Sequence, residues 1–204
     1  MSNQEQDKFW QENFSAIATF PYSWLGKATE LLDAANLVLV RQNEESLKGI
    51  YRNLTVYMML TAFAFENIFK AIVLKREPTI INDSEQKNKL FSGHDLCRLA
   101  KQAKVSCSAY ETDLLRRLSK SVFGGRYPIP KDWVTYKGGL DGSGSEPSGV
   151  FILPKDFIGI INFVHKLEAE LKLLGIDCDL YDLSYSFTKD GKSILVKRNI
   201  DPHH

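Results

Sequence analysis

The feature that most constrains this chain is the apolar run VYMMLTAFAFENIFKAIVL at residues 56–74. The run is long enough for a bilayer span. However, Thr61, Glu66 and Lys70 lie within it, and charged side chains at that depth of a membrane are costly. A helix that is apolar on nearly all sides is typical of the centre of a water-soluble bundle. We therefore expect a buried central helix over about 47–76 and no membrane partner.

Segments on both sides of this run carry apolar residues at three-and-four spacing, which predicts amphipathic helices. The predicted segments are a helical arm at 1–20 with Phe9, Trp10, Phe14 and Ile17 on one side, a helix at about 22–43 and a final helix at about 154–174. Pro21 interrupts the first two, because proline lacks an N–H and crowds the preceding turn. Residues 77–91 are expected to form a connection with no more than one turn of helix.

Two serines have the spacing of helix starts. In a capping box, a serine hydroxyl and a carboxylate three residues later each accept a backbone N–H. Ser92 with Asp95 and Ser108 with Glu111 fit this pattern, so we expect a helix behind each pair.

The chain changes character after residue 124. Seven of the 13 glycines lie at 124–149, which predicts a long glycine-rich loop at about 137–149. Near the end, alternating apolar residues flank Asp190-Gly191, a pattern typical of a β-hairpin. The predicted fold is therefore mainly α, an antiparallel helical bundle over 1–175 followed by a C-terminal hairpin and tail over 176–204.

Composition narrows the function classes. The 204 residues include 26 basic and 25 acidic side chains, so the formal net charge of +1 creates no overall field for nucleic acid or membrane. Cys97, Cys107 and Cys178 are too widely spaced for a disulfide framework or a zinc site. The polar N-terminus lacks the layout of a signal peptide, so we expect a cytoplasmic protein.

A metal site is not predicted. His165 and Glu168 have the i, i+3 spacing of two ligands, but a bundle site needs matching ligands on a facing helix. We expect no metal and no cofactor.

Three charged or titratable residues lie within or close to apolar segments, where such side chains need a partner or a function. Glu66 and Lys70 are four residues apart on the most apolar helix, so they share a face and can pair. They either line a pocket for a phosphate or carboxylate, or form an internal clamp that an arginine from another helix completes. His94 is expected in the first turn of a helix. It is either a general base or a donor to phosphate, or it bonds a neighbouring group and orders the preceding loop.

The densest basic cluster is interleaved with aromatic residues, a combination that binds single-stranded RNA through phosphate pairing and base stacking. The alternative is a solvated helix face followed by core aromatics. The cluster comprises Arg116, Arg117, Lys120, Arg126 and Lys131, with Tyr127, Trp133 and Tyr136.

Three short motifs resemble the HEPN group of small bacterial helical proteins: AFAFENIFKAIVL in the central helix, GHDL at 93–96 and RYP at 126–128. In the order and spacing of its elements, the resemblance covers roughly 22–174. The resemblance implies an antiparallel bundle that usually forms a homodimer. HEPN proteins include RNA-cleaving toxins, phage-defence components and accessory subunits that pair with nucleotidyltransferases, so it also implies a cognate partner protein.

The chain departs from the motif of HEPN ribonucleases, an arginine followed a few positions later by a histidine on the bundle. Between Arg41 and Arg126 nothing matches, and the one match, Arg198-Asn199 followed by His203, lies in the tail. The candidate catalytic residues are His94, Arg126, Arg198 and His203, and the candidate ligand-binding residues are Glu66, Lys70, His94, Arg117, Arg126 and Tyr127.

These observations favour a HEPN-like protein of a defence or toxin–antitoxin system that binds RNA, a nucleotide or a partner protein. Two alternatives stay open: a metal-independent ribonuclease of unusual design, and a dimerising interaction module without other activity.

Overall fold

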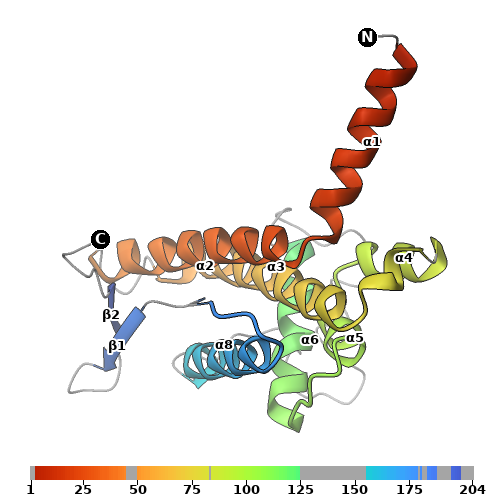
Figure 1. Cartoon of the computed structure of the whole chain (residues 1–204). Helices are drawn as coiled ribbons and strands as arrows, with labels where there is room; N and C mark the ends of the chain where they lie inside the picture. Colours follow the sequence, from red (N-terminus) through yellow and green to blue (C-terminus); the bar gives the residue numbers. More distant parts are fainter. Residues whose placement is uncertain are drawn as a thin grey trace, which may run out of the picture.

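The structure, a computed structural model, describes residues 3–44, 50–82, 84–124, 155–178, 180, 183–187 and 194–198. This part of the chain is mainly helical, which confirms the predicted class (Figure 1). Its elements are α1 (Asn3–Thr19), α2 (Pro21–Glu44), α3 (Ile50–Arg76), η1 (Pro78–Asn82), α4 (Ser84–Phe91), α5 (Leu96–Gln102), α6 (Ala109–Gly124), α8 (Lys155–Leu173), β1 (Leu183–Phe187) and β2 (Ile194–Arg198).

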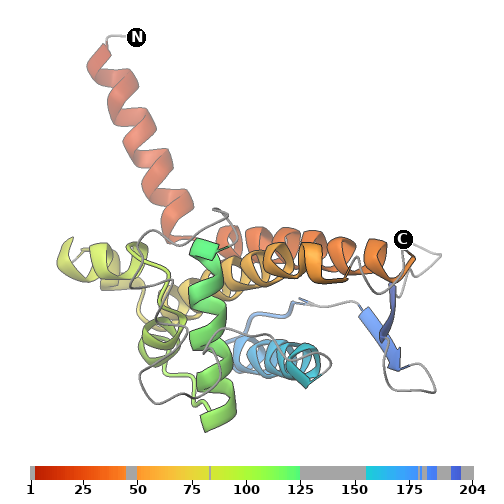
Figure 2. The same ribbon diagram turned by 180° about the vertical axis from the view of Figure 1, so that it is seen from behind.

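Helix α3 is the centre of the bundle, as its apolar sequence predicts. It packs along the antiparallel α2 and also contacts α5, α6 and α8 (Figures 1 and 2). Phe65 and Phe69 lie against Phe163 of α8, with ring centroids 5.4 and 6.2 Å apart. Within the described residues, Leu54–Arg76 is long and apolar enough to cross a membrane, and 72% of its most apolar window is buried in the bundle.

The α1–α2 junction is a single non-helical residue, Phe20. Pro21 begins α2 directly, a position where the missing N–H costs nothing because the first helical amides have no partner within the helix. The indole N–H of Trp24 donates to the carbonyl of Ala18 at 2.9 Å. This bond ties the end of α1 to the first turn of α2.

The capping prediction at Ser92 was wrong. Helix α5 begins at Leu96, and its N-cap is Asp95, whose carboxylate accepts the amide of Arg98 at 3.0 Å. Ser92 lies too early in the chain and its amide instead donates to the carbonyl of Asn88. Residues 77–91 are also more ordered than the predicted connection, because they form η1 and then the two-turn helix α4.

The second capping box is confirmed. Ser108 Oγ accepts the amide of Glu111 at 3.2 Å, and a carboxylate oxygen of Glu111 accepts the amide of Ser108 at 2.6 Å. Lys166 of α8 reaches the same carboxylate at 2.9 Å. The start of α6 is therefore tied to α8 as well as capped.

The C-terminal part begins with a helix stop at the predicted place. Gly175 follows α8 with φ of +73°, the left-handed conformation that favours glycine. The backbones of β1 and β2 pair antiparallel, with Tyr185 opposite Val196. The glycine-rich loop at 137–149 and the Asp190-Gly191 turn lie outside the described residues.

Helices α6 and α8 are in close contact at Gly159. A β-carbon at this position would lie 2.4 Å from the hydroxyl oxygen of Tyr110. That hydroxyl is in turn bonded at 3.1 Å to both the carbonyl of Lys155 and the carboxylate of Asp156. The absence of a side chain at Gly159 therefore makes room for a bonded tyrosine.

We expect Gly159→Ala to displace Tyr110 and lower the free energy of unfolding by about 1–3 kcal/mol, the usual cost of overpacking. Urea denaturation measures the change. The double variant Gly159→Ala, Tyr110→Phe is the control, because it removes the clashing oxygen and should recover part of the loss. Unchanged stability in Gly159→Ala would contradict the close packing.

Acid stability tests the capping box. Burial opposes ionisation of Glu111, but the Ser108 amide and Lys166 outweigh it and hold the pKa of this carboxyl below its ordinary value. A carboxyl group whose pKa is lower in the folded state than in the unfolded state stabilises the protein at pH values above its unfolded-state pKa. This contribution is lost as the pH falls through the folded-state pKa. Glu111→Gln should therefore lose about 1 kcal/mol near neutral pH, where the carboxyl is ionised, and little in acid strong enough to protonate Glu111 in the folded protein. Urea denaturation at both pH values measures this, and an equal loss at both would contradict it.

Candidate functional site

Three polar side chains form a chain of short contacts through the bundle. Lys70 Nζ lies 2.6 Å from Glu66 Oε1, and Glu66 Oε2 lies 2.7 Å from His94 Nδ1. Glu66 and Lys70 are only 6% and 5% exposed, whereas the His94 side chain is 28% exposed. The predicted i, i+4 pair is thus confirmed, and its third member is a histidine rather than an arginine.

Two aromatic rings cover the cation of this chain. Trp24 and Phe91 stack with centroids 5.3 Å apart, and Lys70 Nζ lies 4.9 Å and 5.9 Å from their respective centres. Aromatic faces attract cations, which offsets part of the cost of removing an ammonium from water. Because Trp24 belongs to α2 and Phe91 to α4, the cluster joins both helices to α3.

His94 lies in the loop before α5 and not in the first helical turn as predicted, because α5 is capped by Asp95 and begins at Leu96. The same contacts position this loop. Besides its bond to Glu66, His94 packs its edge against Phe63, with centroids 5.5 Å apart. Arg98 secures the loop from the other side, because its guanidinium donates to the carbonyls of Lys89 and Ser92 at 2.6 and 2.9 Å. The GHDL segment is therefore held by both its own helix and α3.

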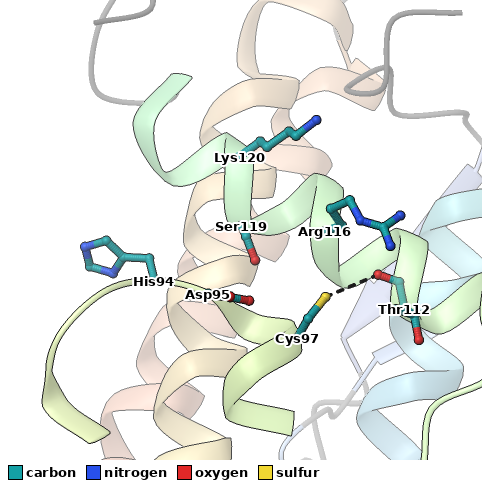
Figure 3. A pocket seen from close by; sticks show the side chains of 7 residues that line it. All are labelled: His94, Asp95, Cys97, Thr112, Arg116, Ser119 and Lys120. Atoms are coloured by element: carbon teal, nitrogen blue, oxygen red, sulfur yellow. Dashed lines mark hydrogen bonds between the residues drawn. The ribbon is translucent and has the colours of Figure 1, made fainter. Parts of the chain in front are cut away.

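His94 borders an open pocket of about 510 Å³ between the start of α5 and one face of α6 (Figure 3). The α6 residues in it recur at helical spacing, so they share a face. The lining residues are His94, Asp95 and Cys97 on the α5 side, and Thr112, Arg116, Ser119 and Lys120 on α6.

Hydrogen bonds hold the two walls together. Ser119 Oγ accepts the amide of Leu96 at 3.0 Å and donates to the carbonyl of Leu115 at 2.8 Å. Cys97 Sγ donates to the carbonyl of Thr112 at 3.5 Å (Figure 3). Burial, with the Asp95 carboxylate, raises the pKa of the Cys97 thiol. It is therefore a neutral wall residue rather than a nucleophile.

The pocket carries more positive than negative groups that can reach a ligand. The Arg116 side chain is 56% exposed, and its contact with Asp113 at 3.2 Å is a surface ion pair. Lys120 is exposed one turn further along α6. Asp95 is occupied by capping α5. Arg116 and Lys120 are the groups on this face of α6 that can attract an anion, whereas the His94 ring points away from them (Figure 3).

Arg117 points the other way, into the contact between α6 and α8. Its guanidinium forms a two-pronged pair with the buried Asp156, with one N–O distance of 2.9 Å, and its Nε donates to Asp113 at 2.9 Å. The hydrogen bonds to Asp156 outweigh burial and raise the pKa of Arg117. Tyr110 completes the cluster, where burial and the neighbouring Asp156 raise its pKa to about 12. Arg117 therefore serves the interior of the bundle.

The remaining predicted site residues are not brought to this pocket by any described contact. Arg126, Tyr127 and His203 lie outside the described residues. Arg198 ends β2, where the backbone alone is described. His165 Nδ1 lies 2.8 Å from Glu168 as an ordinary helix pair, and the described residues contain no cluster of three metal-binding side chains.

Sequence reasoning missed the polar walls of the pocket. The sequence pattern indicates Asp95 only as part of a capping box, and nothing in it singles out Thr112 or Ser119. The i, i+4 and i+7 spacing of Thr112, Arg116 and Ser119 was the available signal. Sequence reasoning also missed Asp156. This carboxylate directly precedes the apolar stripe of α8, and a carboxylate that is buried there requires a cation as its partner.

Comparison with known proteins returned no matching family model, no matching curated protein and no matching solved structure.

The buried cluster predicts a large stability difference between two similar ion pairs. Glu66–Lys70 and Glu85–Lys89 have the same spacing and the same 2.6 Å distance, but the second pair is exposed. Glu66→Gln should lower the free energy of unfolding by about 3 kcal/mol, because it leaves the buried ammonium uncompensated. The control Glu85→Gln should cost less than about 0.5 kcal/mol. Thermal and urea denaturation measure both, and equal losses would contradict the clamp.

Proposed function

We propose that this chain is a HEPN-like protein that binds single-stranded RNA through its phosphate groups, at the pocket between α5 and α6. The observation that carries the proposal is that two exposed cations of α6, Arg116 and Lys120, line the same pocket of about 510 Å³ as His94. Arginine and lysine side chains bind phosphate groups through charge-assisted hydrogen bonds, and such contacts supply most of the hydrogen bonds in nucleic-acid complexes.

The placement of the sequence motifs supports this. The GHDL histidine lines the pocket, and the cationic residues come from the helix that leads to the RYP motif at 126–128. The buried Glu66–Lys70 pair then has an indirect role, because Glu66 also contacts His94 and holds it at the edge of the pocket. Glu66 and Lys70 are positioning residues in this view, and ligand contact belongs to His94, Arg116 and Lys120.

One contact favours ribonuclease activity as the second candidate function. A carboxylate on Nδ1 of a histidine favours the tautomer with its proton there, which makes Nε2 the basic nitrogen. The Glu66–His94 contact of 2.7 Å has this form. A base at the pocket edge can accept the proton of an RNA 2′-hydroxyl without a metal, so that the 2′-oxygen bonds to the adjacent phosphorus as the P–O5′ bond breaks and the 5′-oxygen leaves with a proton from water. Arg116 would stabilise the negative charge on the phosphoryl oxygens.

Binding is tested with a short fluorescent single-stranded RNA of mixed sequence, titrated at low and at moderate salt. We expect measurable affinity at low salt that falls steeply with salt, because phosphate contacts release counterions. Arg116→Ala and Lys120→Ala should each weaken binding by about 3- to 10-fold and reduce the salt slope by about one contact. Inorganic phosphate or a mononucleotide should compete if the pocket takes a single phosphate group.

The matched control is Lys172→Ala, which removes an exposed lysine of α8 that does not line the pocket. An equal loss of affinity in this variant would mean general charge attraction, and no binding at low salt would reject the proposal. Incubating the same RNA in EDTA separates the two functions. Cleavage that disappears in His94→Ala indicates a ribonuclease, whereas intact RNA bound by the wild-type chain indicates binding alone.

A further inference from the structure

Among the described residues that line the pocket between α5 and α6, Asp95 is the one with a carboxylate. Asp95 is exposed, and its Oδ1 accepts the amide of Arg98 at 3.0 Å. Within the described part of the chain, no hydrogen bond reaches its second oxygen, Oδ2. A carboxylate has about four acceptor sites. Capping α5 therefore leaves Asp95 able to accept hydrogen bonds from a ligand.

The uncharged side chains of the pocket walls use their donors inside the protein. Cys97, Thr112 and Ser119 each donate to a backbone carbonyl of α6 or of the serine that caps it. A ligand therefore meets Asp95, which only accepts hydrogen bonds, and the two cations of α6, which only donate them.

The acceptor and one of the cations lie on either side of a thiol. Figure 3 shows the Cys97 sulfur between the Asp95 carboxylate and the Arg116 guanidinium. Both charges act on the pKa of this thiol, which Asp95 raises and Arg116 lowers. A few polar groups placed in this way fix the orientation of a ligand. The matching ligand has a negative charge at one end and N–H donors at the other, which is the construction of a nucleotide.

We propose that Asp95 contacts the base beside the bound phosphate and makes the pocket selective for guanine. The inference rests on the proposed RNA binding and adds the base to it. Proteins that bind single-stranded RNA form hydrogen bonds with the Watson–Crick edges of unpaired bases. On this edge guanine has two adjacent donors, N1–H and the 2-amino group, which match the two oxygens of a carboxylate.

The other bases match a carboxylate less well. Adenine and cytosine each present one amino group beside ring acceptors. Uracil presents carbonyl oxygens on both sides of a single N–H, and these oxygens are repelled by the carboxylate. The expected order of affinity therefore has guanine first and uracil last.

The pocket also has room for a base together with its phosphate. Its volume of about 510 Å³ lies within the range of cavities that hold small ligands, about 300–1,000 Å³. Inorganic phosphate would place a second negative charge near Asp95, whereas a base places donors there. Guanosine monophosphate should therefore compete with RNA better than inorganic phosphate or uridine monophosphate does.

The test compares the affinity of the full chain for three fluorescent RNA decamers at low salt. One contains uridine alone, one has a single central guanosine, and one has a single central inosine, which lacks only the 2-amino group of guanosine. All three carry the same phosphates, so the phosphate contacts contribute equally. We expect the guanosine decamer to bind about 5- to 10-fold more tightly than the uridine decamer, with the inosine decamer between them.

The variant Asp95→Asn separates base contact from helix capping. Asparagine caps a helix as well as aspartate does, so the melting temperature should be unchanged. The amide replaces one acceptor with a donor, so the preference for guanosine should fall below about twofold. Affinity for the uridine decamer should stay equal or rise, because a negative charge leaves the pocket. The matched control Asp177→Asn removes an exposed carboxylate that does not line the pocket and should keep the preference.

The outcomes distinguish this inference from the proposed function. Equal, salt-dependent binding of all three decamers by the wild type would overturn the base contact and leave phosphate binding standing. A guanosine preference that persists in Asp95→Asn would place the base contact elsewhere and overturn the assignment. An equal loss of affinity for every decamer in Asp95→Asn would mean that Asp95 only orders the loop before α5. No binding of any decamer would reject this inference together with the proposed function.

Discussion

The contact between Lys70 and Glu66 is the constraint on which the rest of the structure depends. Two charges in the middle of an apolar helix cost several kcal/mol each unless they are paired, and both are almost fully buried here. Their satisfaction requires groups from three other segments: Trp24, Phe91 and His94. The two buried charges of α3 therefore favour the packing of α2, α4 and the loop before α5 around this helix.

Helix α6 connects the interior with the surface because its faces have different chemistry. One face directs Arg117 toward Asp156 of α8, where the guanidinium is enclosed. The adjacent face presents Arg116 and Lys120 to the pocket. Neighbouring arginines in the sequence thus have opposite roles, since successive residues of a helix point about 100° apart. A basic cluster read along the chain overstates the charge that a ligand meets.

Much of the fold follows from the sequence because it depends on local periodicity. The apolar run predicts α3, the Ser108–Glu111 box predicts the start of α6, and Gly175 follows α8 as expected. The failure at Ser92 has a physical reason: Asp95 is itself a good N-cap, and its carboxylate accepts the amide of Arg98, so α5 begins three residues later than a Ser92 cap would place it.

The site was less predictable, because its partners come from distant parts of the chain. The i, i+4 spacing identified the Glu66–Lys70 pair, but a contact over 28 residues with His94 has no periodicity to reveal it. The same holds for Arg117 and Asp156, which are 39 residues apart. Sequence reasoning found the charged residues and could not sort the enclosed ones from those that face the pocket.

Trp24 makes two contacts that join different parts of the molecule. Its ring nitrogen holds the last turn of α1 through Ala18, and its ring face covers the ammonium of Lys70. The indole ring is rigid. A change in the direction of α1 about Phe20 therefore either breaks the hydrogen bond between Trp24 and Ala18 or rotates the indole ring that covers the Lys70 ammonium. The direction of the arm and the anchoring of the pocket histidine are therefore mechanically linked through one side chain.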